Sequence, residues 1–355
     1  MEKEVHKVSI KKVFTILLSF AIIIALTGCS VLDMMAGIKN EDKENAFDHF
    51  AIIEDDTDES DDGKAVETMS PNSDVPKKGI IAYYKDINGF VIPVNTDIEL
   101  EEGIAKAVIR QMVVGSAKEK QLAEIDIHGT IPEGTEIIGM SIQDGLCVVD
   151  FNKNILNTAS YDDEKAMVTA ISYALTEFDT INSVEIRVEG KILSTLSNGY
   201  PIDTAFEREN INLIGSADGA NYTVFFKTAE TEIEGHYVPI TFSAEKVDNP
   251  IKIVLEKLFN GAPADMPVQN DIPFGISFND VNVTNGTAKI DLSVDALKLK
   301  QEDYDELKKI VVLCLQQFED ISEVDFSIEG ISFEEAGLIF TDSEVKAVFE
   351  DFNRK

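Results

Sequence analysis

Residues Asp144–Phe151 read DGLCVVDF, and residues Asn285–Leu292 read NGTAKIDL. Both stretches contain a turn dipeptide, a strand of alternating apolar residues and an aspartate, and their glycines, Gly145 and Gly286, lie 141 residues apart. A spacing of this size is that of a whole domain, and it exceeds the short periods of solenoid repeats. The chain therefore contains one folding unit twice, so a group shared by both copies is a stronger functional candidate than a group in one copy.

Each of the two stretches predicts a β-hairpin. Asp144-Gly145 and Asn285-Gly286 both suit the positive φ angles of a type I′ turn. In the strand after each turn, alternate side chains point to the same side of the sheet. The inward side chains are expected to be Cys147, Val149 and Phe151 in the first copy and Ala288, Ile290 and Leu292 in the second. Asp150 and Asp291 are then expected to face outward.

A long amphipathic helix follows each hairpin. Apolar residues recur at helical spacing from Met167 to Phe178 and again from Leu307 to Phe318. Acidic residues precede both runs, where carboxylates stabilise the positive end of the helix dipole. These acids therefore indicate the start of a helix rather than a pair of catalytic carboxylates. A third matched strand follows each helix, at 184–188 and 324–328, and is itself followed by Glu-Gly.

Upstream of each hairpin, the copies share two strands and a shorter helix. The strands begin near Ile80 and Tyr222, and the helices end at Gly115 and at Asn260-Gly261, where glycine suits the left-handed residue past a helix end. Each copy thus predicts strand, strand, helix, hairpin, helix and strand. The expected fold class is α+β, with two tandem two-layer units in which two helices cover one face of a single small sheet.

The N-terminus predicts a lipoprotein signal. Lysines precede an apolar run from Val13 to Leu26, which is short for a membrane span and typical of a secretory signal. The run ends in Leu26-Thr27-Gly28-Cys29, which resembles the bacterial lipobox. That motif implies a diacylglyceryl thioether on Cys29 and cleavage before it. The alternative is a signal anchor with a chance cysteine. Two acyl chains would hold the protein firmly to the outer face of the cell membrane.

The segment after Cys29 predicts an acidic tether. Residues 41–74 are dominated by Asp and Glu, and such a composition cannot bury enough apolar surface to offset the entropy of ordering. A short docking helix around Phe47 and Phe50 is the alternative. The domain boundaries expected from the whole sequence are 1–28 for the signal peptide, 29–77 for the tether, 78–203 for the first domain, 204–218 for a linker, 219–348 for the second domain and 349–355 for a tail.

Composition and the comparison of copies exclude several classes of function. The formal net charge of −34 argues against a nucleic-acid partner, which requires clustered Lys and Arg. His128 and His236 have no counterpart in the other copy, and Cys147 and Cys314 stand opposite alanines, so both cysteines are expected to be buried and inert. The stretch 280–286 fails as a calcium loop because its glycine falls one position late. No catalytic residue, metal ligand or cofactor site is predicted, and the protein is expected not to be an enzyme.

The order of these features resembles the GerM-type sporulation and germination lipoproteins over about residues 78–348. The resemblance rests on the lipobox, the polar tether and two units that each contain Ile-Pro-x-Gly, a hairpin ending in Asp, a long apolar helix and Glu-Gly. It implies a domain similar to the ring-building motif of secretion-system proteins. It also implies a structural role on the mother-cell membrane around the forespore, in the channel complex of endospore formation. The partners implied are the membrane, envelope proteins of that complex and further copies of the chain.

Other functions stay open at this point. Two small domains could form a cleft for an envelope ligand or peptidoglycan, and a hydrolase would need a nucleophile and base that converge on His128 or His236. The copies also differ on the outward side of the hairpin strand, where the first has Leu146 and Val148 and the second has Thr287 and Lys289. We expect the apolar face of the first copy to be covered by the other copy or by a partner.

Overall fold

The computed structural model describes residues 77–99, 103–208, 210–216, 219–228, 235–244 and 248–341. All of them lie in one compact unit, Asn72–Lys355. Cys29 and nearly all of the predicted tether lie outside the described residues, so the structure does not test either prediction.

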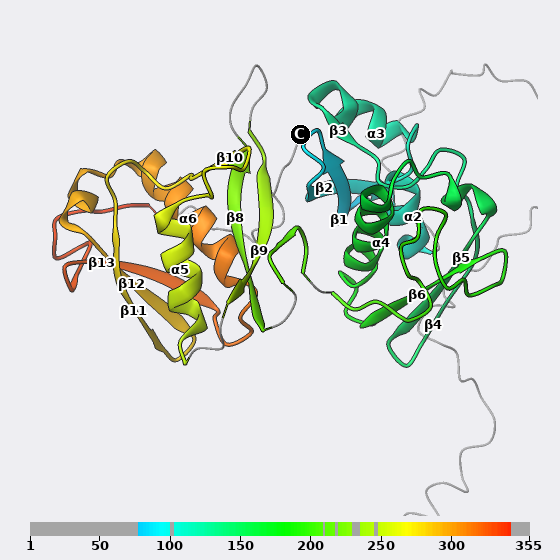
Figure 1. The fold of residues 1–355 in the computed structure, drawn as a ribbon. Helices are drawn as coiled ribbons and strands as arrows, with labels where there is room; N and C mark the ends of the chain where they lie inside the picture. Colours follow the sequence, from blue (N-terminus) through cyan, green and yellow to red (C-terminus); the bar gives the residue numbers. More distant parts are fainter. Residues whose placement is uncertain are drawn as a thin grey trace, which may run out of the picture. The chain divides into compact units, whose positions relative to one another are not determined.

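The first repeat comprises the strands and helices up to β6 (Figure 1). In chain order they are β1 (Lys77–Asp86), β2 (Val91–Glu99), α2 (Ile104–Gln111), α3 (Ala117–Leu122), β3 (Ile127–His128), β4 (Ile137–Gln143), β5 (Leu146–Phe151), α4 (Tyr161–Leu175) and β6 (Ser183–Val188). The predicted order of strand, strand, helix, hairpin, helix and strand is present. The short α3 and β3, which lie between the first helix and the hairpin, were not predicted.

The second repeat reproduces this order after a short linker strand, β7 (Leu213–Ile214). Its elements are β8 (Ala220–Thr228), β9 (Tyr237–Ala244), α5 (Pro250–Asn260), β10 (Val268–Gln269), β11 (Phe278–Thr284), β12 (Thr287–Leu292), α6 (Gln301–Leu315), β13 (Glu323–Ile328) and β14 (Ile331–Ser332). The α+β fold class with two tandem units is confirmed.

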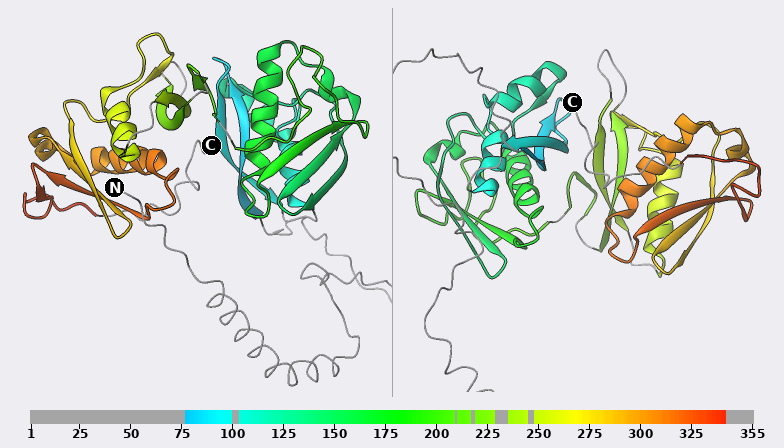
Figure 2. Two further views of the ribbon diagram at one scale, coloured as in Figure 1. Left: turned by 60° about the horizontal axis from the view of Figure 1, so that its bottom comes forward. Right: turned by 180° about the vertical axis from the view of Figure 1, so that it is seen from behind.

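Each repeat carries two small sheets rather than the single sheet that was expected. The strand orders are β2-β1-β3 and β4-β5-β6 in the first repeat, and β10-β8-β9-β7 and β11-β12-β13-β14 in the second. The long helix of each repeat contacts both of its sheets, α4 through β1 and β6 and α6 through β8 and β13, and Figure 2 shows α4 between the two sheets of the first repeat. A helix between two sheets must bury side chains on more than one face, which explains why ten of the 15 residues of α4 are buried.

The hairpin predictions are confirmed by the backbone geometry. Asp144 and Gly145 have φ angles of 52° and 83°, and Asn285 and Gly286 have φ angles of 53° and 84°. Both pairs thus form the two-residue turn that suits the twist of an antiparallel hairpin. The inward side chains Cys147, Val149 and Phe151 and their counterparts in β12 are all fully buried. Each returning strand then pairs in parallel with the strand that follows the long helix.

The helix starts also follow the sequence. Ser160 caps α4 by accepting a hydrogen bond from the backbone amide of Asp163, and Asn249 caps α5 ahead of a first-turn proline. The acids 162–164 lie in the first turn of α4, as expected. One of them, Glu164, is completely buried and accepts backbone amides from Asn198 (2.6 Å) and Tyr200 (3.0 Å), so it also holds the loop after β6 against the helix.

The apolar outer face of the first hairpin is partly covered. Leu146 and Val148 are half-buried, on a sheet face that they share with the ion pair between Arg187 and Glu185. The residues beside them in the sheet, Ser183 and Glu185, belong to the same repeat, so this partial burial does not test the predicted cover by the other copy or by a partner.

Candidate functional site

A cavity of about 890 Å³ is lined by residues of both repeats, and we call it the inter-repeat cavity. Much of its wall comes from equivalent positions in the two copies. The equivalent pairs are Tyr83 and Phe225, Pro93 and Pro239, Tyr173 and Leu313, and Glu177 and Gln317. The pairing is supported by strand register, because Tyr83 lies opposite Pro93 in β1-β2 and Phe225 lies opposite Pro239 in β8-β9.

The two repeats also contact each other through equivalent strands. β2 of the first repeat contacts β9 of the second, and each is the second strand of its repeat. When two copies contact each other through the same element of each copy, the interface is isologous, as it is in a two-fold dimer. The duplicated unit therefore uses one face to pair with itself inside a single chain, and the inter-repeat cavity lies on that face.

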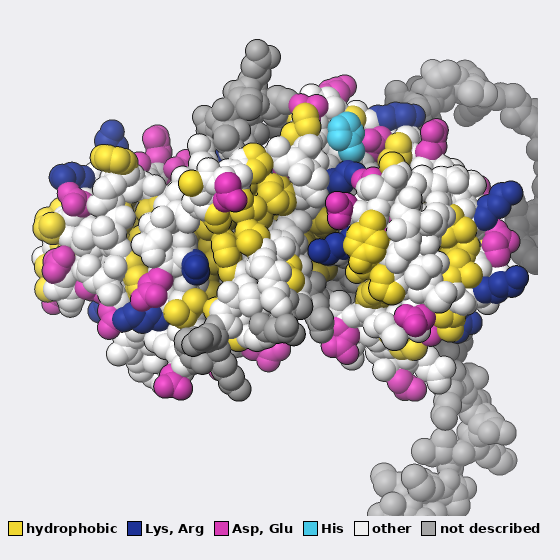
Figure 3. Space-filling view, in the orientation of Figure 1, with side chains coloured by type: hydrophobic (Ala, Val, Ile, Leu, Met, Phe, Trp, Pro, Cys, Tyr) yellow, Lys and Arg dark blue, Asp and Glu magenta, His cyan; other side chains and the backbone are white. Residues whose placement is uncertain are grey.

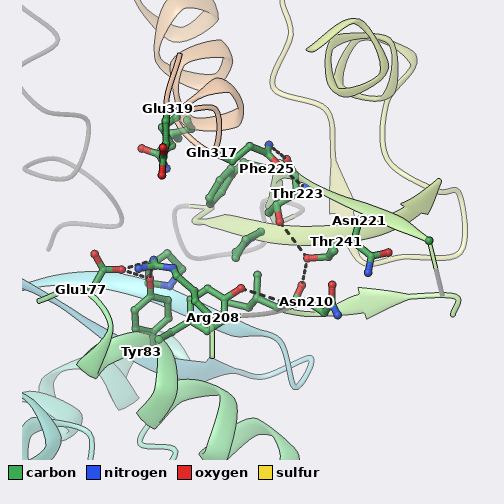
Figure 4. Close-up of a pocket in the computed structure, with 17 residues that line it drawn as sticks. Tyr83, Glu177, Arg208, Asn210, Asn221, Thr223, Phe225, Thr241, Gln317 and Glu319 are labelled. Atoms are coloured by element: carbon green, nitrogen blue, oxygen red, sulfur yellow. Dashed lines mark hydrogen bonds and ion pairs between the residues drawn. The ribbon is translucent and has the colours of Figure 1, made fainter. Parts of the chain in front are cut away.

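The wall from the first repeat and the linker is ionic (Figure 4). Tyr83 donates a hydrogen bond of 2.6 Å to the Glu177 carboxylate, and Arg208 forms an ion pair with the same carboxylate and donates to the Tyr83 hydroxyl (2.7 Å). The guanidinium of Arg208 also lies over the Tyr173 ring, 4.7 Å from its centroid. Burial and the neighbouring Glu177 raise the pKa of Tyr83 well above its ordinary value, so Tyr83 stays a neutral donor.

The wall from the second repeat is made of amides and hydroxyls. The side-chain amide of Gln317 pairs with both backbone groups of Thr223, accepting from its N–H (3.0 Å) and donating to its carbonyl (2.7 Å). The hydroxyls of Thr223 and Thr241 lie 3.1 Å apart, and Thr241 donates to the carbonyl of Ile211. Thus the equivalent positions 177 and 317 carry an acid bound to an arginine in one repeat and an amide bound to a strand in the other.

One side chain of the linker, that of Asn212, contacts both repeats. Asn212 accepts a hydrogen bond from the Val91 N–H (2.9 Å) and donates to the carbonyls of Val91 (2.8 Å) and Pro239 (2.8 Å). It thereby pairs with the edge strand β2 as another strand would, while the next residues form β7 beside β9. The predicted linker, residues 204–218, is thus an ordered part of the interface where it is described.

The two described histidines occupy different environments. His128 is exposed in β3, with its Nδ1 3.5 Å from a Glu119 oxygen. His236 is mostly buried, with its Nε2 3.3 Å from the fully buried carboxylate of Asp86 in the first repeat. His236 therefore takes part in a buried contact with the first repeat, whereas His128 is a surface residue. In the described part of the chain, the imidazole of each of these histidines contacts a carboxylate and no serine, threonine or cysteine side chain.

The two described cysteines are buried, as predicted. Burial raises the pKa of the Cys147 thiol to about 11 and that of Cys314 to about 12. The Cys314 sulfur accepts the backbone amide of Phe225 at 3.3 Å. Thiols held in their protonated form inside a core are unreactive, which agrees with the packing role expected for both.

Asp150 and Asp291, expected to face outward, each hold a turn. Asp150 accepts the backbone amide of Gly190 (2.9 Å), and Asp291 accepts that of Gly330 (2.7 Å). In each repeat, the shared aspartate therefore binds the glycine of the shared Glu-Gly pair, and both features serve this one structural contact.

Other kinds of site receive no support within the described part of the chain. There, no group of three or more His, Cys, Asp or Glu residues is arranged to hold a metal ion. On the face seen in Figure 3, Lys and Arg side chains are scattered singly and form no basic stripe. No helix in the described ranges is both long and apolar enough to cross a membrane.

Comparison with known proteins identifies relatives of both repeats. The model of the family Germane, described as "Sporulation and spore germination", matches residues 81–194 and 223–334. The chain is 23% identical over 265 residues to the spore germination protein GerM of Bacillus subtilis (strain 168), covering 70% of this chain and 71% of that protein. Among solved structures, the tandem GerMN domains of the sporulation protein GerM from Bacillus subtilis match with a TM-score of 0.62 and 20% identity, covering 75% of this chain and 94% of theirs.

Proposed function

Since the chain belongs to the Germane family of sporulation and spore germination proteins, we propose that it acts as an assembly protein in endospore formation and germination. In this proposal it is anchored through a lipid on Cys29 to the outer face of the mother-cell membrane and takes part in the channel complex between mother cell and forespore. The observation that carries the proposal is the family match over both repeats. The lipobox at Leu26–Cys29 supports the location.

The interface between the repeats supports a structural role. The chain uses equivalent strands, a linker side chain and a buried histidine contact to hold two copies of one domain together. Such an arrangement leaves the outer sheets β4-β5-β6 and β11-β12-β13-β14 as the surfaces for envelope proteins or further copies of the chain. We propose no catalytic role, because the described cysteines are inert core residues and the described histidines contact carboxylates.

Deletion in the organism of origin tests this function. The deletion strain should form fewer heat-resistant spores or spores that germinate poorly, and the intact gene should restore them. A Cys29→Ala variant should restore them poorly and should leave the membrane fraction, because it lacks the acyl chains. A deletion strain with normal spores that germinate normally would refute the proposed role.

A second candidate is an envelope ligand-binding or peptidoglycan-binding lipoprotein, and the inter-repeat cavity is the observation that favours it. Its volume of about 890 Å³ is in the range of small-molecule sites. Thermal unfolding of the full-length chain with and without a digest of purified cell wall tests this function. A rise in the midpoint that saturates with the digest would support it, and an unchanged midpoint would count against it.

A further inference from the structure

We propose that the inter-repeat cavity binds a short peptide through a free carboxylate, with Arg208 as the residue that anchors it. The proposal deepens the second candidate function and rests on it. It names the chemistry of the ligand and the side chain that recognises it. Three features support the proposal: the hydrogen bonding of the Arg208 guanidinium, the charged side chains that line the cavity and the polar side chains that line the rest of it.

Contacts with described residues hold the Arg208 guanidinium in place but leave some of its hydrogen-bond donors unused. Both of its hydrogen bonds to described residues, to Tyr83 and to Glu177, use the same nitrogen, Nη2. The stack on Tyr173 fixes the plane of the guanidinium, and 38% of the side chain remains exposed at the cavity. Nε and Nη1 are therefore left for a ligand, and a guanidinium fixed in this way loses little conformational entropy on binding.

The charge of the cavity favours a single carboxylate over a more highly charged anion. Arg208 is the one cation among the described residues that line it, and two carboxylates, Glu177 and Glu319, line it as well. A phosphate or a polyanion carries more negative charge than a carboxylate. Against these two carboxylates it would find one cationic partner among the described lining residues. A carboxylate matches the planar fork of an arginine with two parallel hydrogen bonds and brings only one charge.

The rest of the lining suits the amide groups of a peptide. Asn210, Gln316 and Glu319 provide amide and carboxylate oxygens that can accept peptide N–H groups, and the two amides can also donate to peptide carbonyls. A sugar ring would need an open aromatic face, yet Tyr83, Tyr173 and Phe225 are each less than a tenth exposed. Figure 4 shows Arg208 and Glu319 on opposite walls, so a ligand that spans the cavity meets a cation first and an acceptor beyond it.

Isothermal titration of the full-length chain in detergent tests the proposal, with N-acetyl-trialanine as the probe and its C-terminal amide as the comparison. The carboxylate form should bind at least about tenfold more tightly than the amide, because only the carboxylate pairs with the fork. Arg208→Gln should weaken binding of the carboxylate about tenfold and leave the weak binding of the amide unchanged. Arg208→Lys, which keeps the charge next to Glu177, should also weaken it, because a lysine lacks the fork.

Arg187 provides a matched control. It is also paired with a glutamate, Glu185, and its side chain is 39% exposed, but it lies away from the cavity on β6. Arg187→Gln should bind the probe like the unaltered chain. Equal binding of acid and amide, or equal binding by Arg208→Gln, would overturn the proposal.

Titration with a cell-wall digest distinguishes failure of the carboxylate proposal from failure of the second candidate function. If a digest binds to the unaltered chain and to Arg208→Gln alike, ligand binding stands and the carboxylate proposal is wrong. If neither digest nor trialanine binds, both are wrong. Circular dichroism of each variant shows whether a loss of binding comes with a loss of folding, and Arg208→Lys decides the proposal if Arg208→Gln is unfolded.

Discussion

The carboxylate of Asp291 accepts a hydrogen bond of 2.7 Å from the backbone amide of Gly330. The same contact exists in the first repeat between Asp150 and Gly190, at 2.9 Å. In both repeats the glycine follows a glutamate with positive φ, 48° at Glu329 and 51° at Glu189. The aspartate at the end of the hairpin strand thus compensates a turn in which a non-glycine residue adopts a left-handed conformation.

Replacement of Asp291 by alanine should therefore destabilise the second repeat. We expect a loss of about 1–3 kcal/mol in the free energy of unfolding, since the removed acceptor is charged and also binds Ser327 and Asn279. Urea denaturation measures it. Asp179→Ala, at an exposed aspartate, is the control and should stay within about 0.5 kcal/mol of the unaltered chain. Equal stability of the two variants would show that the turn does not depend on Asp291.

The sequence predicts those features of the fold, turns and helix starts, that depend on residues close together in the chain. Asp144-Gly145 and Asn285-Gly286 indicate their turns because few residues tolerate positive φ, and Ser160 and Asn249 act at helix starts that lie beside them in the chain. The long helices follow from apolar periodicity. Their positions in the repeat could therefore be assigned before any tertiary contact was known.

What the sequence could not predict depends on contacts between distant residues. Asn212 pairs with Val91 across 121 residues, and His236 reaches Asp86 across 150, so no local pattern marks either pair. The division of each repeat into two sheets was missed because the strand pairs alternate equally well in one sheet or two. One feature of the sequence could have indicated the cavity. Pro93 and Pro239 lie at matched positions of the two copies, and both line it.

Glu164 should make the stability of the first repeat depend on pH. Burial opposes its ionisation, but hydrogen bonds from the amides of Asn198 and Tyr200 and from Thr158 stabilise the charged form and hold the pKa of Glu164 below its usual value. A carboxyl whose pKa is lowered by folding stabilises the folded state above its unfolded pKa. That contribution is lost as the pH falls through the lowered pKa.

Glu164→Gln should consequently lower stability near neutral pH by about 1–3 kcal/mol and flatten the fall in stability toward acid. Thermal unfolding between neutral pH and the acid limit of the folded state measures both effects. Glu334→Gln, at an exposed glutamate, is the control and should keep the unaltered pH profile. An unchanged acid limb in Glu164→Gln would contradict the role assigned to this carboxylate.

Cys147 and Cys314 should be unreactive until the chain unfolds. Burial raises the pKa of both thiols, to about 11 and about 12, so almost no thiolate is present at mildly alkaline pH and neither sulfur is reachable. A thiol reagent such as Ellman's reagent should report neither residue in the native chain and both in concentrated guanidinium chloride. Rapid labelling of either cysteine in the native chain would show that the core opens there.

Asn212→Asp should weaken the connection between the repeats. The variant keeps a residue that tolerates the φ of 49° at this position, but it removes both donors and places a negative charge next to the carbonyls of Val91 and Pro239. We expect the free energy of unfolding to fall by about 1–3 kcal/mol and hydrogen exchange at the Val91 amide to accelerate. Asn210→Asp, at a residue with a φ of 52° that makes neither contact, is the matched control. If both variants exchange at Val91 like the unaltered chain, the repeats are held together by β2 and β9 and the histidine contact without the linker side chain.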